Sequence, residues 1–357
     1  MISAGKAPYH RNPLYIGAVA MLLVVACLVF YVAYAEQGPA KTITLRWLIL
    51  HTPIEPFERA ARVFADVLEK ETGNKVDLQI LTRQDFPSSS KTNAAEEVFQ
   101  LLDDGTVQLG SVYLYDVNQT IQTIPEFQAL SLPYMFNDYE STENFIGNPL
   151  SHQILEKYSA QTSVRALALT FSGGFRIILS DKKLTSTDDF KGLHTVVRPG
   201  KYNLNFFTTI GAKLTVAPSD ASGNKFYGPE INAAETSYIA APRRLGPNTK
   251  FINETMHSLV MSMIITSDTF YNSLSARDQQ AFQKAAALAA KAEREDSIAL
   301  AERHKSELQQ QGLTVVPMSS GMIEALRSQA QSTYDMFESD FGSDIITSIR
   351  AAEVTPL

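Results

Sequence analysis

The chain has 357 residues, which at roughly 150 residues per domain suggests two domains. Hydrophobic residues make up 45% and charged residues 19%, a composition typical of globular proteins rather than disordered or fibrous ones. Lys and Arg number 31 against 38 Asp and Glu, so the net charge of −7 argues against a nucleic-acid partner. The single cysteine, Cys27, excludes an internal disulfide and any metal site built from several cysteines.

The N-terminus has the features of an export signal. Lys6 and Arg11 precede an apolar run over residues 14–35, which ends in Ala-Tyr-Ala, and this pattern predicts a signal peptide that is cleaved after Ala35. The run is also long enough, at ~22 residues, to remain as an uncleaved membrane anchor. A lipobox ending at the cysteine is a third interpretation, but the apolar run continues beyond it. In each case residues 36–357 are exported, and the lack of cysteines there favours a bacterial periplasm.

Hydrophobic periodicity predicts strands that alternate with helices, an α/β fold. A period of two over residues 42–50 indicates a strand, and a helical period over residues 56–72 ends at Gly73. With the next strand these form a β-α-β unit, which places its strands in parallel. The predicted strands are residues 42–50, 75–81, 107–114, 166–169, 176–179, 194–198 and 260–266, and further helices cover residues 96–102 and 148–160.

One predicted helix is far longer than the others. It begins after Ser275, an N-cap residue, and ends near Gln311, before Gly312. At 1.5 Å per residue it would measure ~50 Å, which is longer than one small domain. The helix is therefore expected to span two lobes.

The sequence lacks the usual motifs of enzyme chemistry. Its six histidines are not paired at metal-ligand spacing, and there is no zinc-protease, phosphate-loop, dinucleotide-binding or nucleophile-elbow motif. We therefore expect no metal, no cofactor and no enzymatic activity.

Several stretches, in the same order, resemble one family of transport proteins. Residues 45–81 read LRWLILHTPIEPFERAARVFADVLEKETGNKVDLQIL, residues 130–150 read LSLPYMFNDYESTENFIGNPL, and residues 173–199 read GGFRIILSDKKLTSTDDFKGLHTVVRP. They are similar to the solute-binding proteins of TRAP transporters (DctP type), the periplasmic receptors of tripartite, ion-driven carboxylate uptake systems. Residues 260–290 continue the resemblance, which covers most of residues 42–340.

The resemblance implies a two-lobed periplasmic binding protein fold. A ligand cleft would lie between two α/β lobes, a long helix would span both, and the N-terminal signal or anchor helix would precede them. Lobe I would comprise residues 42–172 plus 262–301, and lobe II residues 173–261 plus 302–345. Most members of the family are monomers, and the same is expected of this chain.

The resemblance also implies two arginines that hold the ligand carboxylate, as suits a planar guanidinium fork. Arg176 matches the family's arginine in the Gly-Phe-Arg strand. The other family arginine would fall at Val196, counted from the Lys-Gly-Leu turn, whereas this chain has Arg198 two residues later on the same strand face. Arg198 either takes over that role or ends the strand before Pro199. On the clasp hypothesis, Arg176→Ala abolishes binding with little change in melting.

Further site candidates follow from the resemblance and from strand ends. Thr236 stands where the family often has a ligand-binding Asn, and Tyr238 follows two residues later. In the first lobe, His51 follows the first strand, and Tyr113 and Tyr115 follow the third. All five are candidate ligand-binding residues, with a turn or core role as the alternative.

The predicted function is capture of an organic acid by lobe closure and its delivery to TRAP permease subunits in the membrane. Dicarboxylates, keto acids, sugar acids, aromatic acids and amino-acid-like compounds all remain open as ligands. The alternative is a membrane-tethered extracytoplasmic sensor or scaffold on the same fold, favoured by the long apolar N-terminus and by Val196. A hydrolase or lyase using cleft carboxylates is a third, less favoured hypothesis.

Overall fold

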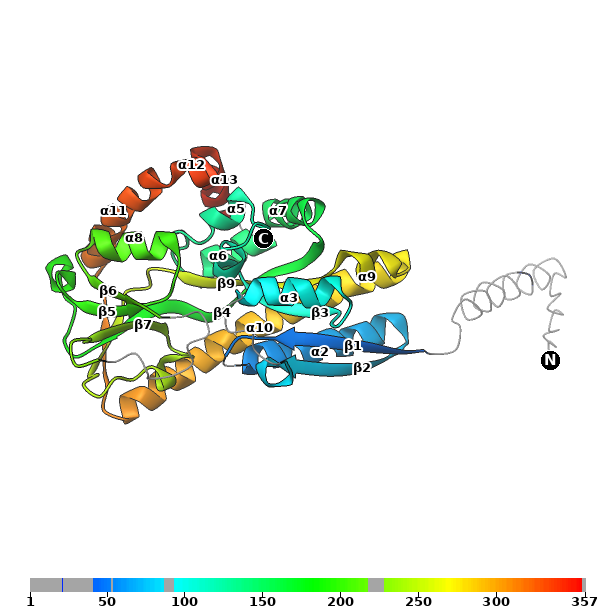
Figure 1. Ribbon diagram of the computed structural model, residues 1–357, viewed down its shortest axis with the longest axis horizontal. Coiled ribbons are helices and arrows are strands. Elements are labelled where there is room, and N and C mark those ends of the chain that lie inside the picture. The colour runs from blue at the N-terminus through cyan, green and yellow to red at the C-terminus, as the bar shows by residue number, and fades with distance from the viewer. Residues whose placement is uncertain (1–20, 22–40, 53, 87–92, 218–227, 355–357) are drawn as a thin grey trace, which may run out of the picture.

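The computed structural model describes residues 21, 41–52, 54–86, 93–217 and 228–354 (Figure 1). The predicted signal or anchor segment, residues 1–35, lies outside the described residues apart from Met21. No helix in the described ranges has both the length and the apolar character needed to cross a bilayer.

The first part of the chain forms the β-α-β unit that the periodicity predicted. Strand β1 (Thr42–Ile49) pairs in parallel with β2 (Lys75–Thr82) and β3 (Leu109–Tyr113). Helix α2 (Glu55–Thr72) connects β1 to β2, and Gly73 at φ 73° ends it in a left-handed conformation that favours glycine. On the other side of β3 lies β9 (Leu259–Ser267), which is antiparallel to it.

Strand β4 (Val164–Ser180) joins the two halves of the sheet. The sequence predicted two strands, 166–169 and 176–179, but they are parts of one 17-residue strand. Gly173 and Gly174 lie between them at φ 86° and 71°, conformations costly for other residues, and the register against β9 shifts at this point. The strand bends here without ending, which period-two patterning does not reveal.

Beyond the bend, β4 pairs with different partners. Strands β7 (Ala233–Ser237) and β8 (Phe251–Glu254) run antiparallel to it. Strand β5 (His194–Val197) is parallel to β7 and to β6 (Lys213–Val216), and β10 (Thr314–Pro317) is parallel to β8. The order of the main sheet is β2-β1-β3-β9-β4-β7-β5-β6.

The remaining elements cover the sheet. The helices are α3 (Ala94–Asp103), α4 (Leu114–Val117), α5 (Pro125–Ala129), α6 (Tyr139–Gly147), α7 (Pro149–Gln161), α8 (Lys201–Thr209), α9 (Asp268–Ser273), α11 (Ser320–Met336), α12 (Glu338–Phe341) and α13 (Ser343–Glu353). Among the described residues, short 3-10 helices are η1 (Arg83–Asp85), η2 (Thr187–Phe190) and η3 (Ala241–Arg243). Because α4 begins at Leu114, the third strand is shorter than the predicted 107–114.

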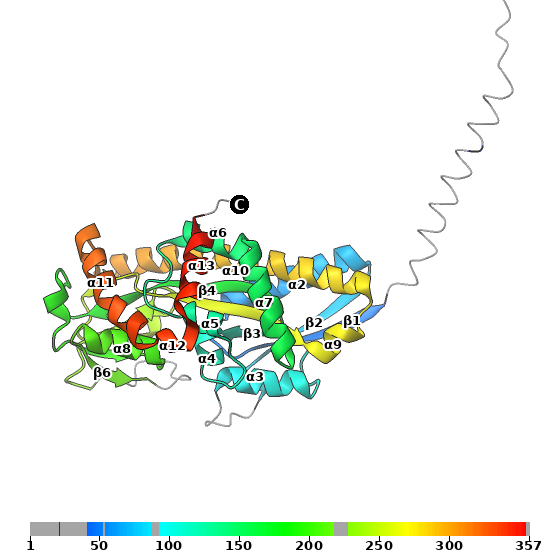
Figure 2. The ribbon, with the colours of Figure 1, turned by 90° about the horizontal axis from the view of Figure 1, so that it is seen from above.

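The long helix is confirmed. Helix α10 (Ala276–Gln310) has 35 residues, so it is about 52 Å long, and the Ser275 side chain accepts a hydrogen bond from the Asp278 amide as its N-cap. It packs against α2 near its start, then against β4 and η3, and it runs the length of the molecule (Figure 2). Its buried alanines permit this close packing.

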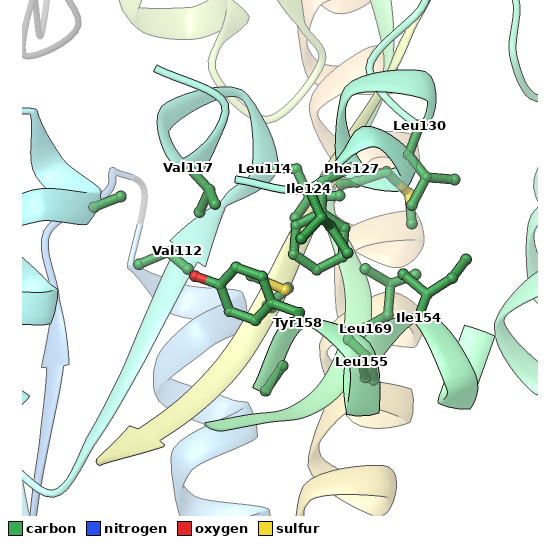
Figure 3. Packing of buried hydrophobic residues seen from close by; sticks show 14 of the residues in the cluster. Val112, Leu114, Val117, Ile124, Phe127, Leu130, Ile154, Leu155, Tyr158 and Leu169 are labelled. Carbon is green, nitrogen blue, oxygen red and sulfur yellow. The ribbon is translucent and has the colours of Figure 1, made fainter. Parts of the chain in front are cut away.

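A hydrophobic cluster holds α4 in place against the sheet. Leu114 and Val117 of α4 point toward Ile124, Phe127 and Tyr158 (Figure 3). The ring centroids of Phe127 and Tyr158 are 4.8 Å apart. Because Leu114 and Val117 lie three residues apart and are buried, this packing fixes the orientation of the helix that carries Tyr115.

Candidate functional site

A cavity of about 460 Å³ lies where the two parts of the sheet meet. The cavity is lined by residues of strands β4, β7 and β9, of helices α4 and α8, and of the segment that follows β5. Its lining residues are Leu114, Tyr115, Asn118, Gln119, Ser131, Arg176, Arg198, Pro199, Gly200, Lys201, Tyr202, Asn203, Leu204, Glu235, Ser258, Leu259, Val260 and Met261. The volume is in the usual range for a small-molecule site.

A buried ion pair forms one wall. Arg176 on β4 and Glu235 on β7 are both buried, and Arg176 Nε lies 2.5 Å from Glu235 Oε1. Burial raises the pKa of Glu235, but the charge and hydrogen bond of Arg176, together with the His257 ring 3.6 Å away, outweigh it and hold that pKa well below its usual range. Glu235 is therefore ionised at neutral pH.

Glu235 also organises the neighbouring loop. Its Oε2 accepts hydrogen bonds from the backbone N–H of Arg198 at 3.1 Å and from Asn203 Nδ2 at 3.2 Å. Glu235 thus connects β4 and β7 to the segment between β5 and α8. Sequence reasoning missed this residue, although a charged residue among small buried residues of a strand was an available signal.

Arg198 projects from the end of β5 toward α4. Its guanidinium donates a hydrogen bond to the Tyr115 hydroxyl, and its Cζ lies 5.3 Å from the Tyr115 ring centroid. Among the described residues, no carboxylate forms an ion pair with this guanidinium. The Tyr115 ring stacks on Tyr113, with the centroids 5.3 Å apart.

A buried His–Asp pair lies behind these tyrosines. The His51 ring centroid is 4.0 Å from that of Tyr113, and His51 Nε2 is 3.9 Å from Asp116 Oδ2. Burial, with the charge of Arg198, lowers the pKa of His51 to about 3. Burial raises the pKa of Asp116 to about 7, against the effect of Arg198. His51 is neutral at physiological pH, while Asp116 titrates there.

The structure therefore brings together some of the predicted site residues and separates others. Arg176, Arg198 and Tyr115 line the cavity, whereas Tyr113 and His51 lie behind Tyr115 and do not line it.

Thr236 and Tyr238 lie outside the cavity lining. Thr236 neighbours Glu235 on β7 and so points to the opposite face of the strand, where its hydroxyl lies 3.4 Å from the Ser237 carbonyl. Tyr238 packs in a core with residues of α10 and donates its hydroxyl to Glu254 Oε1 at 2.8 Å. Strand alternation, which the family pattern alone does not consider, explains the position of Thr236, whereas Tyr238 lies in the turn that follows β7.

Two further polar residues of the lining are tied to the C-terminal helices. Lys201 Nζ is 2.6 Å from Asp340 Oδ2 of α12. The Tyr202 hydroxyl lies 2.6 Å from Gln128 Oε1 and 3.2 Å from Asp340 Oδ2. The described residues contain no group of three or more His, Cys, Asp or Glu side chains that could hold a metal ion.

Comparisons with known proteins agree with this architecture. Residues 50–340 match the family described as bacterial extracellular solute-binding protein, family 7. The sialic acid-binding periplasmic protein SiaP of Vibrio cholerae is 24% identical over 305 residues, which cover 82% of this chain and 87% of the relative.

Solved structures share the fold. A TRAP periplasmic solute-binding protein from Ochrobactrum anthropi superposes with a TM-score of 0.76 at 17% identity, covering 88% of this chain and 95% of that one. One from Haemophilus influenzae with bound L-gulonate gives a TM-score of 0.71 at 24% identity, covering 87% and 100%. The two-lobed α/β fold inferred from the resemblance is confirmed, while its exact lobe boundaries stay a prediction. The chain belongs to the bacterial extracellular solute-binding proteins of family 7.

Proposed function

We propose that the cavity binds the carboxylate of a small organic acid and that Arg198 is its main anchor. The observation that carries this proposal is the Arg198 guanidinium, which lines the cavity and has no carboxylate partner among the described residues. Its planar fork offers parallel donors to two carboxylate oxygens. Each charge-assisted hydrogen bond contributes about 1.5–3 kcal/mol.

Arg176 has a different role in this proposal. Its Nε is occupied by Glu235, and Glu235 in turn holds the Arg198 backbone and Asn203. Arg176 thus acts first as a positioning residue that keeps the Arg198 loop in place. Any contact it makes with the ligand comes from guanidinium N–H groups that Glu235 leaves unbonded.

Tyr115 orients the Arg198 guanidinium. The phenol stays protonated because burial raises its pKa. Its oxygen therefore accepts a hydrogen bond from Arg198 without placing a negative charge that would compete with the ligand carboxylate for the guanidinium. The stack of Tyr115 on Tyr113 and His51 supports this arrangement from behind.

The wider biological role follows from family membership. The family is one of solute-binding receptors, and the names of relatives include sialic acid and C4-dicarboxylate binding. We propose that this chain closes its lobes around the acid and delivers it to TRAP permease subunits at the inner membrane, as a non-enzymatic monomer in the periplasm. Retention of residues 1–35 would anchor it there, and the alternative role of a tethered sensor or scaffold also depends on that segment.

A binding experiment with matched probes tests this function. The purified chain is titrated with small organic acids and with their neutral amides, and its melting temperature is measured. A ligand that binds only the native state raises stability by RT ln(1 + [L]/Kd), about 2.7 kcal/mol at a hundredfold excess over Kd. We expect shifts with acids but not with amides. Equal shifts for both, or none with any acid, would contradict carboxylate capture.

A further inference from the structure

We infer that the ligand is a monocarboxylate whose remainder is apolar, such as a branched aliphatic or aromatic acid. This inference rests on the proposed function and narrows its substrate class. It comes from the partners that the charged and polar side chains around the cavity already have.

The first observation concerns positive charge. Three described cations line the cavity, and two of them are already neutralised by a carboxylate: Arg176 by Glu235 at 2.5 Å and Lys201 by Asp340 at 2.6 Å. Only Arg198 lacks such a partner among the described lining residues. The cavity can thus neutralise the charge of one ligand carboxylate, whereas a second carboxylate would be repelled by Glu235 and Asp340.

The second observation concerns hydrogen bonds. The Asn118 amide donates to the Phe127 carbonyl and to Ser131 Oγ, both at 2.9 Å, and accepts from Thr123. Asn118 therefore helps to hold its own loop and has little capacity left for a ligand.

Three other polar lining residues also have hydrogen-bonding groups in use within the protein. Gln119 Nε2 donates to the Tyr115 carbonyl at 3.0 Å, and Asn203 Nδ2 donates to Glu235. The Tyr202 hydroxyl is engaged by Gln128 and Asp340. A ligand with several hydroxyl groups would lose its hydrogen bonds to water and regain only part of them here, which is costly once water is excluded.

The third observation concerns the remaining wall. Consecutive residues of β9 contribute apolar surface, joined by apolar residues of α4 and α8, and these are Leu114, Leu204, Leu259, Val260 and Met261. Burial of apolar ligand surface against them stabilises the complex through the hydrophobic effect. The cavity thus combines one charged anchor with an apolar compartment.

Isothermal titration of the full chain with four probes of similar size tests this inference. The probes are 4-methylpentanoate, adipate, L-gulonate and 4-methylpentanamide. We expect 4-methylpentanoate to bind at least about tenfold more tightly than each of the others, a difference of about 1.4 kcal/mol. Tighter binding of adipate or L-gulonate would overturn the inference but leave carboxylate capture intact. Equal binding of the amide, or no binding of any acid, would overturn the proposed function as well.

A gain-of-function variant tests the charge argument separately. Asp340→Asn frees Lys201 to meet a second carboxylate, so the affinity for adipate should rise about tenfold relative to that for 4-methylpentanoate. Glu338→Gln removes a carboxylate from the same short helix α12 at an exposed position, and serves as the matched control. An unchanged adipate preference in Asp340→Asn, or an equal gain in Glu338→Gln, would contradict the assignment of Lys201 to Asp340.

Discussion

Breaking the ion pair between Arg176 and Glu235 should destabilise the protein as well as its ligand site. Both side chains are buried, with Nε and Oε1 2.5 Å apart. Removing one partner leaves the other as an uncompensated buried charge, which typically costs about 3–5 kcal/mol. We expect a loss of this size in the free energy of unfolding for Arg176→Met and for Glu235→Gln. This replaces the expectation from sequence that loss of Arg176 barely affects melting.

The double variant distinguishes the pair from two independent effects. Because Arg176→Met with Glu235→Gln removes both charges, it should lose less stability than the sum of the two single variants, with a coupling of at least about 2 kcal/mol. Urea unfolding of the ligand-free protein, followed by far-UV circular dichroism, measures this. The exposed pair of Asp188 and Lys191, 2.6 Å apart, supplies the control: Asp188→Asn should change stability by about 0.5 kcal/mol or less.

The pH dependence adds an independent test of the same pair. The folded-state pKa of Glu235 is held below its unfolded value, so its contribution is present above that value and is lost as pH falls through the folded pKa. The stability advantage of the wild type over Glu235→Gln should therefore shrink in acid. If the losses of unfolding free energy in the two single variants added up in the double variant, and the wild-type advantage over Glu235→Gln did not change with pH, the two residues would not form a coupled buried ion pair.

Three further predictions concern other buried groups. Burial raises the pKa of Glu293 from 4.5 to about 8 in the folded chain, so the stability of the wild type falls as pH rises between these two values. In thermal melts, the stability of Glu293→Gln relative to the wild type should therefore increase by about 3 kcal/mol between pH 5 and pH 8. If this difference did not grow with pH, Glu293 would not be held protonated. Asp116, with a pKa raised to about 7, becomes charged as pH rises beside the neutral His51, and opposes a ligand carboxylate at Arg198. Acid affinity should therefore fall several-fold from pH 6 to pH 8, and titration calorimetry of Asp116→Asn should show no such fall. Gly174→Ala places a methyl group 2.4 Å from the Tyr139 hydroxyl, on a residue whose φ is 71°. Urea unfolding should show a loss of about 1–3 kcal/mol in the free energy of unfolding. No loss would mean that the β4 bend tolerates a side chain.

Local patterns predicted most of the elements because those patterns have local causes. The amphipathic period of α2, its glycine stop and the Ser275 cap of α10 act within a few residues of the positions they control. The bend in β4 was missed because two glycines in a sequence indicate equally a turn between strands or a bulge within one.

The site was harder to predict for a physical reason. Arg176 and Glu235 are 59 residues apart in the chain and meet only through the antiparallel register of β4 and β7. A family pattern placed Arg176 and Arg198 near the ligand, but it gave no information on which of them is already neutralised. Side chains alternate between the two faces of β7, so Glu235 faces the cavity and Thr236, the next residue, faces away from it.

A crystal structure of the chain with bound 4-methylpentanoate shows directly whether Arg198 anchors the ligand. We expect a carboxylate oxygen about 2.7–2.9 Å from the Arg198 guanidinium, with the branched tail against Leu259 and Met261 and the ion pair of Arg176 with Glu235 intact. A carboxylate bound to Lys201 in place of Asp340, or to Arg176 after displacement of Glu235, would show that Arg198 is not the anchor.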